Sequence, residues 1–199
     1  MTTLTIKAQD AFNAHGGILR TTEALAAGIH PRTLYAMRNT GQIETLARGV
    51  YRLAGLPPMA NPDLATVAKR VPNGVICLIS ALAFHELTTQ IPHEVHIAIS
   101  RTARRPSLTF PPLRIYRFSS EAFEAGVETH TMDGIPVRVY SPEKTLADCF
   151  KYRGKIGMDV VLEALRTYRR QKQKFQKVLE YARICRVERL MRPYLEALA

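Results

Sequence analysis

Tryptophan is absent from this sequence and cysteine is scarce. The scarcity of cysteine argues against a disulfide-rich protein or a zinc-cluster protein. The 199 residues include no Trp and three cysteines, Cys77, Cys149 and Cys185. These cysteines are odd in number, far apart and set in apolar or helical stretches. We therefore expect neither a disulfide framework nor a zinc cluster, and the thiols suit a reducing cytosol.

Long hydrophobic runs are also missing. No apolar run approaches the roughly 18–20 residues that span a bilayer, and the N-terminal MTTLTIKAQD lacks a basic region followed by an apolar core. We expect a cytoplasmic protein that is neither secreted nor membrane-spanning. Its hydrophobic content of 46% is nevertheless high enough to support a packed core.

Acidic residues are in short supply. Lys and Arg number 28 against 17 Asp and Glu, for a formal net charge of +11 and a pI near 9.9. Residues 1–56 carry six basic and three acidic groups, 57–143 carry eight of each, and 144–199 carry fourteen and six. Two basic ends favour a polyanionic partner, with nucleic acid the leading candidate, because neutralising phosphates releases counterions.

A cluster of prolines predicts a domain boundary. Pro57, Pro58 and Pro62 follow a strand-like run and cannot continue a central strand or helix. We expect one domain at 1–56, a Pro-rich linker at 57–62 and a second domain at 63–199.

The first domain has the pattern of a winged helix-turn-helix. Helical patterns cover about 6–14, 21–27 and 31–39, the last opening on His30-Pro31, and strand patterns at 43–46 and 50–53 flank a tight turn. In such a fold the last helix enters the major groove and the hairpin, or wing, contacts the backbone.

Side chains on that helix and wing are the candidate DNA contacts. Leu34 and Met37 share the inward face, which leaves the basic and aromatic residues outside. The predicted DNA-binding residues are Arg32, Thr33, Tyr35, Arg38, Arg48 at the hairpin tip and Arg52 on its flank. A solvated helix face is the alternative interpretation of the same arginines.

The second domain alternates helices and strands and then becomes helical. We expect a mixed α/β domain that ends in a helical bundle, so the fold class is α+β. Expected helices are 62–70, 80–87, 141–154, 159–170, 175–185 and 188–198, and expected strands are 95–99, 113–118, 127–131 and 135–140.

Basic residues also gather toward the C-terminus. The stretch from 166 to 177 is dense in Lys and Arg and holds no acid. It extends a nucleic-acid footprint, contacts a protein partner or is a solvated face. The candidate basic surface consists of Lys144, Lys151, Arg153, Lys155, Arg169, Arg170, Lys172 and Lys174.

No pattern indicates catalysis. The sequence has neither a Gly-x-Ser-x-Gly motif nor a phosphate-binding glycine loop, and His85, His93 and His96 match no zinc spacing. Glu143 and Lys144 lack the intervening residue of a nuclease Glu-x-Lys strand. We expect a protein that is not an enzyme, with no catalytic residue, metal or cofactor.

Taken together, the motifs resemble those of the AbiEi family of type IV antitoxins. The resemblance rests on HPRTLY at 30–35 and ARGVYRL at 47–53, and it continues through LISALAFHELT at 78–88, VHIAI at 95–99, DGIPV at 133–137 and SPEKTLADCFKYR at 141–153. Carried by these segments in this order, the resemblance extends over nearly the whole chain.

The resemblance implies an antitoxin that represses its own operon. Its N-terminal domain is expected to bind inverted repeats in the promoter, as a monomer or weak dimer in solution that binds DNA cooperatively. Its C-terminal domain is expected to counteract a nucleotidyltransferase-like toxin without a stable complex. The alternative is an RNA- or protein-binding module without operator-specific DNA binding.

Overall fold

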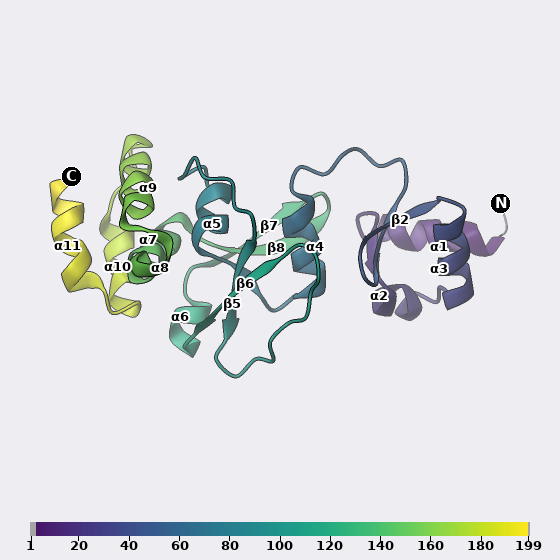
Figure 1. Cartoon of the computed structure of the whole chain (residues 1–199). Helices are drawn as coiled ribbons and strands as arrows, with labels where there is room; N and C mark the ends of the chain where they lie inside the picture. The colour runs from purple at the N-terminus through teal and green to yellow at the C-terminus, as the bar shows by residue number, and fades with distance from the viewer. Residues whose placement is uncertain (1–2, 199) are drawn as a thin grey trace. The chain divides into compact units, whose positions relative to one another are not determined.

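The computed structural model describes residues 3–198 and confirms an α+β fold (Figure 1). The chain divides into two compact units. The first consists of the chain up to Pro72 with residues 107–111 and 130–137, and the second of residues 73–106, 112–129 and 138 onward.

The first unit starts with helices and strands in the order expected of a winged helix-turn-helix. Buried Phe12, Leu19, Leu34, Met37 and Tyr51 form part of its core. Its sheet has the order β1-β3-β2, with both pairs antiparallel. The elements are α1 (Thr3–Ala14), β1 (Ile18–Arg20), α2 (Thr21–Ala26), α3 (Pro31–Asn39), β2 (Ile43–Ala47) and β3 (Val50–Leu53).

Strand β1 is the element of this region that the sequence pattern does not predict. It has three residues, too few to show an alternation of apolar and polar side chains. Pairing with β3, which sets Leu19 opposite Tyr51, holds it in place. A long-range contact therefore defines this strand.

Helix α4 (Pro62–Arg70) packs against β1, β2 and β3, so the first unit extends past the predicted 57–62 linker. Lys69 Nζ lies 3.3 Å from the carboxylate of Glu23 in α2. Arg70 donates a hydrogen bond of 3.0 Å to the backbone carbonyl of Arg48 at the wing tip. The prolines at 57–62 therefore follow the end of β3, but they do not mark the end of the first unit.

A close approach of two glycines ties the 130–137 hairpin to this unit. Asp133 and Gly134 form the predicted tight turn, both with positive φ. A Cβ added to Gly16 would lie 2.8 Å from the backbone oxygen of Gly134. Only glycine at position 16 permits this backbone contact.

The second sheet has the strand order β6-β5-β4-β8-β7. Strand β5 is parallel to β6 and antiparallel to β4, which is parallel to β8. The four expected strands are confirmed, whereas two-residue β4 was too short to predict. The bounds are β4 (Val75–Ile76), β5 (Val95–Ser100), β6 (Leu113–Phe118), β7 (Val127–Met132) and β8 (Ile135–Tyr140).

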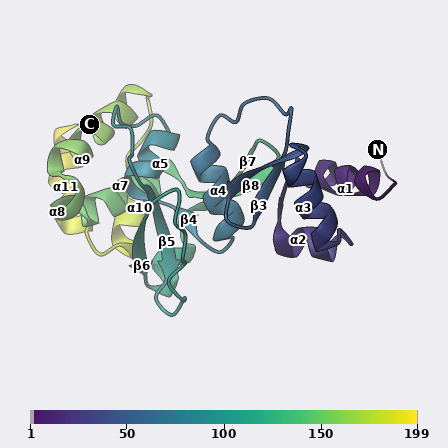
Figure 2. The same cartoon turned by 45° about the vertical axis from the view of Figure 1, so that its right-hand side comes forward.

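Helices complete the second unit, and α7 packs against α5, α9 and α10. Helices α7 to α11 gather in the green-to-yellow part of the chain (Figure 1, Figure 2). The predicted bundle is confirmed, whereas α6 was not predicted and α5 begins and ends earlier than expected. The helices are α5 (Leu78–Phe84), α6 (Ser120–Glu124), α7 (Pro142–Lys151), α8 (Arg153–Ile156), α9 (Met158–Arg170), α10 (Gln176–Ile184) and α11 (Glu188–Ala197).

The cysteines are buried and unpaired with one another. Burial raises the pKa of all three thiols, that of Cys185 to about 12, so they stay protonated at neutral pH. Among residues 3–198, no helix is long and apolar enough to cross a membrane.

Lys144 corrects one sequence prediction. It was assigned to the exposed basic surface, but its side chain is fully buried because α7 is covered on several sides by other elements. Its Nζ lies 2.5 Å from Asp148 Oδ2 one helical turn later and 4.2 Å from the centre of the Tyr140 ring. Asp148 Oδ1 also accepts a hydrogen bond from Cys185 Sγ. This ion pair is part of the core.

Removing one partner of this buried pair should destabilise the fold strongly. We expect Asp148→Ala to lower the free energy of unfolding by about 3–5 kcal/mol, because it leaves a buried ammonium uncompensated. The double variant Lys144→Met/Asp148→Leu should cost less, since it buries no charge. Urea unfolding followed by circular dichroism measures both. A double variant less stable than Asp148→Ala would contradict this account.

Candidate nucleic-acid interface

Helix α2 and the tight turn that follows it set the position of α3. Glu23 accepts a hydrogen bond of 2.8 Å from the backbone N–H of Arg20 at the start of α2. Gly28, at φ +81°, allows the chain to reverse, and the N–H of buried Ile29 donates to the carbonyl of Ala24. The turn directs the chain into α3.

Helix α3 begins as predicted. His30 is its N-cap, and His30 Nδ1 accepts a 3.1 Å hydrogen bond from the backbone N–H of Arg32. Pro31 occupies the first turn, where its missing N–H costs no intrahelical hydrogen bond. The cap therefore places Arg32 in the first turn of the helix.

The two faces of α3 differ as the sequence predicts. Leu34 and Met37 are buried, whereas Arg32, Tyr35 and Arg38 are exposed. The Arg38 guanidinium lies 5.2 Å from the centre of the Tyr35 ring and donates to Asn39 Oδ1. No acidic residue occurs in the helix, so its solvent face is positively charged.

The predicted residues on α3 and the wing tip are accessible, with one partial exception. Thr33 is half-buried on the side of α3. Arg48 is exposed at the turn between β2 and β3, where Gly49 has φ +73°. Backbone freedom at this glycine is what allows so tight a wing tip.

Arg52 was predicted as a DNA contact on the flank of the wing, but the structure buries it. Only 8% of the residue is exposed. Its guanidinium lies 2.7 Å from Glu44 Oε1 across the hairpin and also bonds to the backbone carbonyl of Pro57. Arg52 is therefore held by Glu44 on the paired strand and by the Pro57 carbonyl, and it is not part of the exposed surface.

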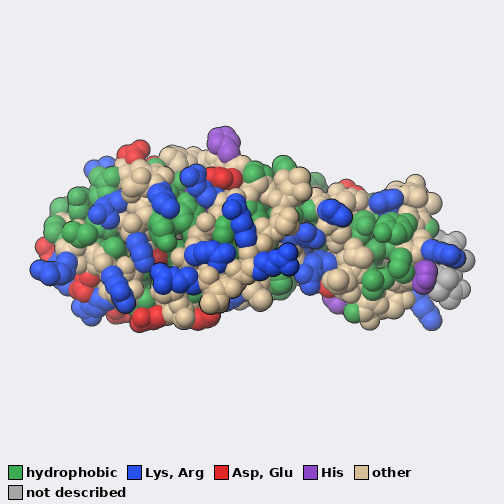
Figure 3. Space-filling model, turned by 60° about the horizontal axis from the view of Figure 1, so that its bottom comes forward, with side chains coloured by type: hydrophobic (Ala, Val, Ile, Leu, Met, Phe, Trp, Pro, Cys, Tyr) green, Lys and Arg blue, Asp and Glu red, His purple; other side chains and the backbone are tan. Residues whose placement is uncertain are grey.

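The C-terminal basic residues other than Lys144 lie at or near the surface of the second unit. Arg153 is half-buried, with its guanidinium 4.9 Å from the centre of the Phe150 ring. On the face that Figure 3 draws, Lys and Arg side chains are more widespread than Asp and Glu. The exposed members are Lys151, Lys155, Arg169, Arg170, Lys172 and Lys174.

The groups considered for metal or nuclease chemistry do not come together. Within residues 3–198, no cluster of three His, Cys, Asp or Glu side chains could hold a metal ion. Burial lowers the pKa of His96 to about 4, so its ring is neutral at pH 7, while His93 is exposed. Glu143 accepts a hydrogen bond from the Tyr168 hydroxyl. Glu143 therefore has a structural partner.

Residues 8–54 match the model of a family described as "Transcriptional regulator, AbiEi antitoxin". The match confirms the predicted resemblance in the N-terminal region, which contains α2, α3 and the wing. It supports a role as a transcriptional regulator and antitoxin. No curated protein matches the sequence.

The fold is similar to that of a solved structure, the RV2827C protein from Mycobacterium tuberculosis. The TM-score is 0.56 at 12% sequence identity, and the alignment covers 98% of this chain and 82% of the other. At this identity the similarity concerns the fold alone.

One candidate residue escaped the sequence analysis. Arg70 ends α4, outside every motif, and contacts the wing tip only because α4 packs on the first sheet. In the sequence, an arginine in the last turn of a helix indicates only a favourable interaction with the helix dipole. It does not indicate a contact with the wing.

Arg52 and Arg48 form a matched pair for testing the wing. We expect Arg52→Ala to lower the free energy of unfolding by about 1–2 kcal/mol, because Glu44 and the Pro57 carbonyl lose their partner. The Glu44 side chain is half-exposed, so water can solvate it in the variant and the loss stays small. Arg48→Ala, at the tip of the same hairpin, should change it by less than about 0.5 kcal/mol. Urea unfolding of both variants decides, and equal losses would count against the assignment.

Proposed function

We propose that the protein binds duplex DNA at its own promoter through α3 and the wing, and thereby represses its operon. The observation that carries the proposal is the face of α3: Arg32, Tyr35 and Arg38 are exposed together on a helix without acidic residues. The regulator family that matches residues 8–54 supports the same function.

Each side chain has a role that its position favours. Arg32, in the first turn of α3, is placed for bidentate contact with O6 and N7 of guanine in the major groove. Tyr35, Arg38 and Thr33 contact neighbouring bases or phosphates. Arg48 contacts a phosphate beside the helix or enters the minor groove, which sets the register of the protein on the duplex. Arg52 is left out because it is buried and paired.

Inverted repeats fit this mode of binding. Two copies of the chain on repeated half-sites would each place one α3 in the groove. We propose that the protein is a monomer or weak dimer in solution and binds cooperatively on the operator.

The second part of the proposal is antitoxin activity in the cytoplasm. The second unit, with its basic surface at Lys151, Lys155 and 169–174, counteracts a nucleotidyltransferase-like toxin without forming a stable complex. The protein acts by binding, and no cofactor is involved. The exposed positive charge of this unit also supports the alternative, an RNA- or protein-binding module in which operator recognition has no part.

Arg32 and Arg48 should affect DNA binding differently. We expect Arg32→Ala to cost about 1–3 kcal/mol on the preferred duplex and to relax base preference at one position. Arg48→Ala should weaken binding equally on all sequences and reduce the log–log salt slope by about 1. Titration of the upstream DNA and its single-base variants at several salt concentrations measures both. Identical, sequence-independent losses would remove the assignment.

Two sets of substitutions should separate repression from protection. In the full-length chain, Arg32→Ala/Arg38→Ala should abolish promoter binding but leave protection intact in cells that express the neighbouring toxin gene. Neutralising the second unit with Arg170→Gln/Lys172→Gln/Lys174→Gln should do the reverse. Reporter expression and colony counts give the two readouts. Loss of protection in the first variant, at unchanged protein level, would contradict separate sites.

A further inference from the structure

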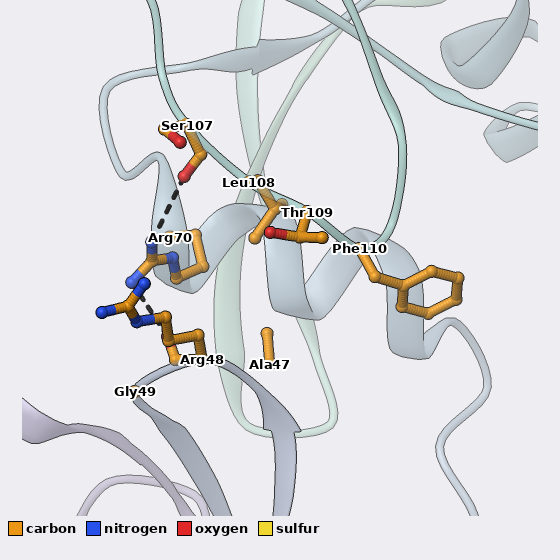
Figure 4. Close-up of a pocket in the computed structure, with 8 residues that line it drawn as sticks. All are labelled: Ala47, Arg48, Gly49, Arg70, Ser107, Leu108, Thr109 and Phe110. Atoms are coloured by element: carbon orange, nitrogen blue, oxygen red, sulfur yellow. Dashed lines mark hydrogen bonds between the residues drawn. The ribbon is translucent and has the colours of Figure 1, made fainter.

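An open pocket of about 380 Å³ lies beside the wing tip, in the first unit. Three segments far apart in the sequence line it: the turn at Arg48 and Gly49, the end of α4 at Arg70, and the 107–110 segment with Ser107 and Thr109 (Figure 4). None of these lining residues is acidic.

Arg70 forms one wall and joins two of these segments. Its Nη1 donates to the backbone carbonyl of Arg48 at 3.0 Å, and its Nη2 donates to the backbone carbonyl of Ser107 at 3.3 Å. The Nε of Arg70 is buried without any hydrogen-bond partner. One donor of the guanidinium is therefore left without a partner in the protein interior.

The pocket holds two positive charges that nothing nearby neutralises. Arg48 and Arg70 both line the pocket, and the Arg70 guanidinium contacts the backbone of Arg48 (Figure 4). Both acceptors of Arg70 are neutral carbonyls, and no carboxylate of the described residues pairs with either arginine. Like charges that line one pocket repel each other, so an anion between them would stabilise this arrangement.

Glycine at the wing tip keeps this side of the pocket free of a side chain. Gly49 has φ +73°, and a Cβ added there would lie 3.2 Å from Thr21 Oγ1 and 3.9 Å from Arg70 Nη1. Ser107 and Thr109, which carry hydroxyl groups, are exposed in the 107–110 segment that lines the same pocket. Two guanidinium groups and hydroxyls around one space are suited to the oxygens of a phosphate group.

We propose that this pocket binds one phosphate group through Arg48 and Arg70 together, and that a backbone phosphate of the operator duplex is its occupant. The inference rests on the proposed function and extends it. Arg70 acts twice: it holds the carbonyl of the wing tip, and it shares the phosphate with Arg48. A free phosphate ion is the other source of the same chemistry.

Salt dependence distinguishes a shared phosphate from two separate ones. Each phosphate neutralised contributes about 0.9 to the log–log slope of affinity against salt. With one shared phosphate, Arg48→Gln and Arg70→Gln should each weaken binding of the upstream duplex by about tenfold. Their double variant should reduce the slope by about 1 in total. Arg189→Gln, which removes one exposed charge from α11, is the matched control.

Arg70→Lys separates the positive charge of Arg70 from the two hydrogen bonds that its guanidinium donates. Lysine keeps the charge but cannot bridge two carbonyls in the same way, so we expect weaker binding with the slope of the native chain. A reduction of the slope by about 2 in the Arg48→Gln/Arg70→Gln variant, or a reduction no greater than in Arg189→Gln, would overturn the shared site.

A second measurement uses inorganic phosphate with the full-length protein. Saturable shifts of the Gly49 and Ser107 amide resonances, lost in Arg48→Gln/Arg70→Gln, support the pocket, and competition by the duplex identifies the DNA backbone as occupant. If the native chain does not bind the duplex but these shifts persist, the proposed function fails and a free-phosphate site remains. If neither probe affects these resonances, the pocket proposal fails, even when the duplex binds elsewhere.

Discussion

Burial of Leu34 and Met37 is the constraint on which the interface depends. These side chains pack against the core of the first unit, so α3 cannot rotate about its axis without exposing them. Because residues of a helix follow one another at about 100°, burying one face determines that Arg32, Tyr35 and Arg38 face solvent. Recognition chemistry is thus a consequence of core packing.

Basic residues of the same type have different roles in this protein because different groups surround them. Arg52 and Arg48 lie four residues apart on one hairpin, yet Glu44 and a backbone carbonyl engage the first while the second remains exposed. Lys144 and Lys151 show the same contrast on α7, where Asp148 holds the buried one. A desolvated cation needs a partner, whereas a solvated cation remains available to an external anion.

Contacts between distant segments shape both sheets. Residues 107–111 and 130–137 leave the second unit in sequence and join the first, and Arg70 reaches the wing through the packing of α4. Basic residues at the wing tip therefore come from parts of the chain with unrelated local patterns. That convergence gives a pocket that no single motif describes.

Local patterns were enough to determine the longer elements. The alternation in β5, β6 and β8, the cap and proline of α3 and α7, and the Asp133-Gly134 turn all express short-range chemistry that one segment contains by itself. They also determined the inward and outward faces of α3, and with them most of the candidate interface.

Tertiary structure decided what depends on partners far along the chain. Strands β1 and β4 exist because β3, β5 and β8 pair with them. The burial of Arg52 and Lys144 and the position of Arg70 follow from neighbours that periodicity cannot reveal. The physical reason is the same in each case: the free energy of a charge or a short strand is set by the groups that surround it, and folding brings those groups from distant positions in the sequence.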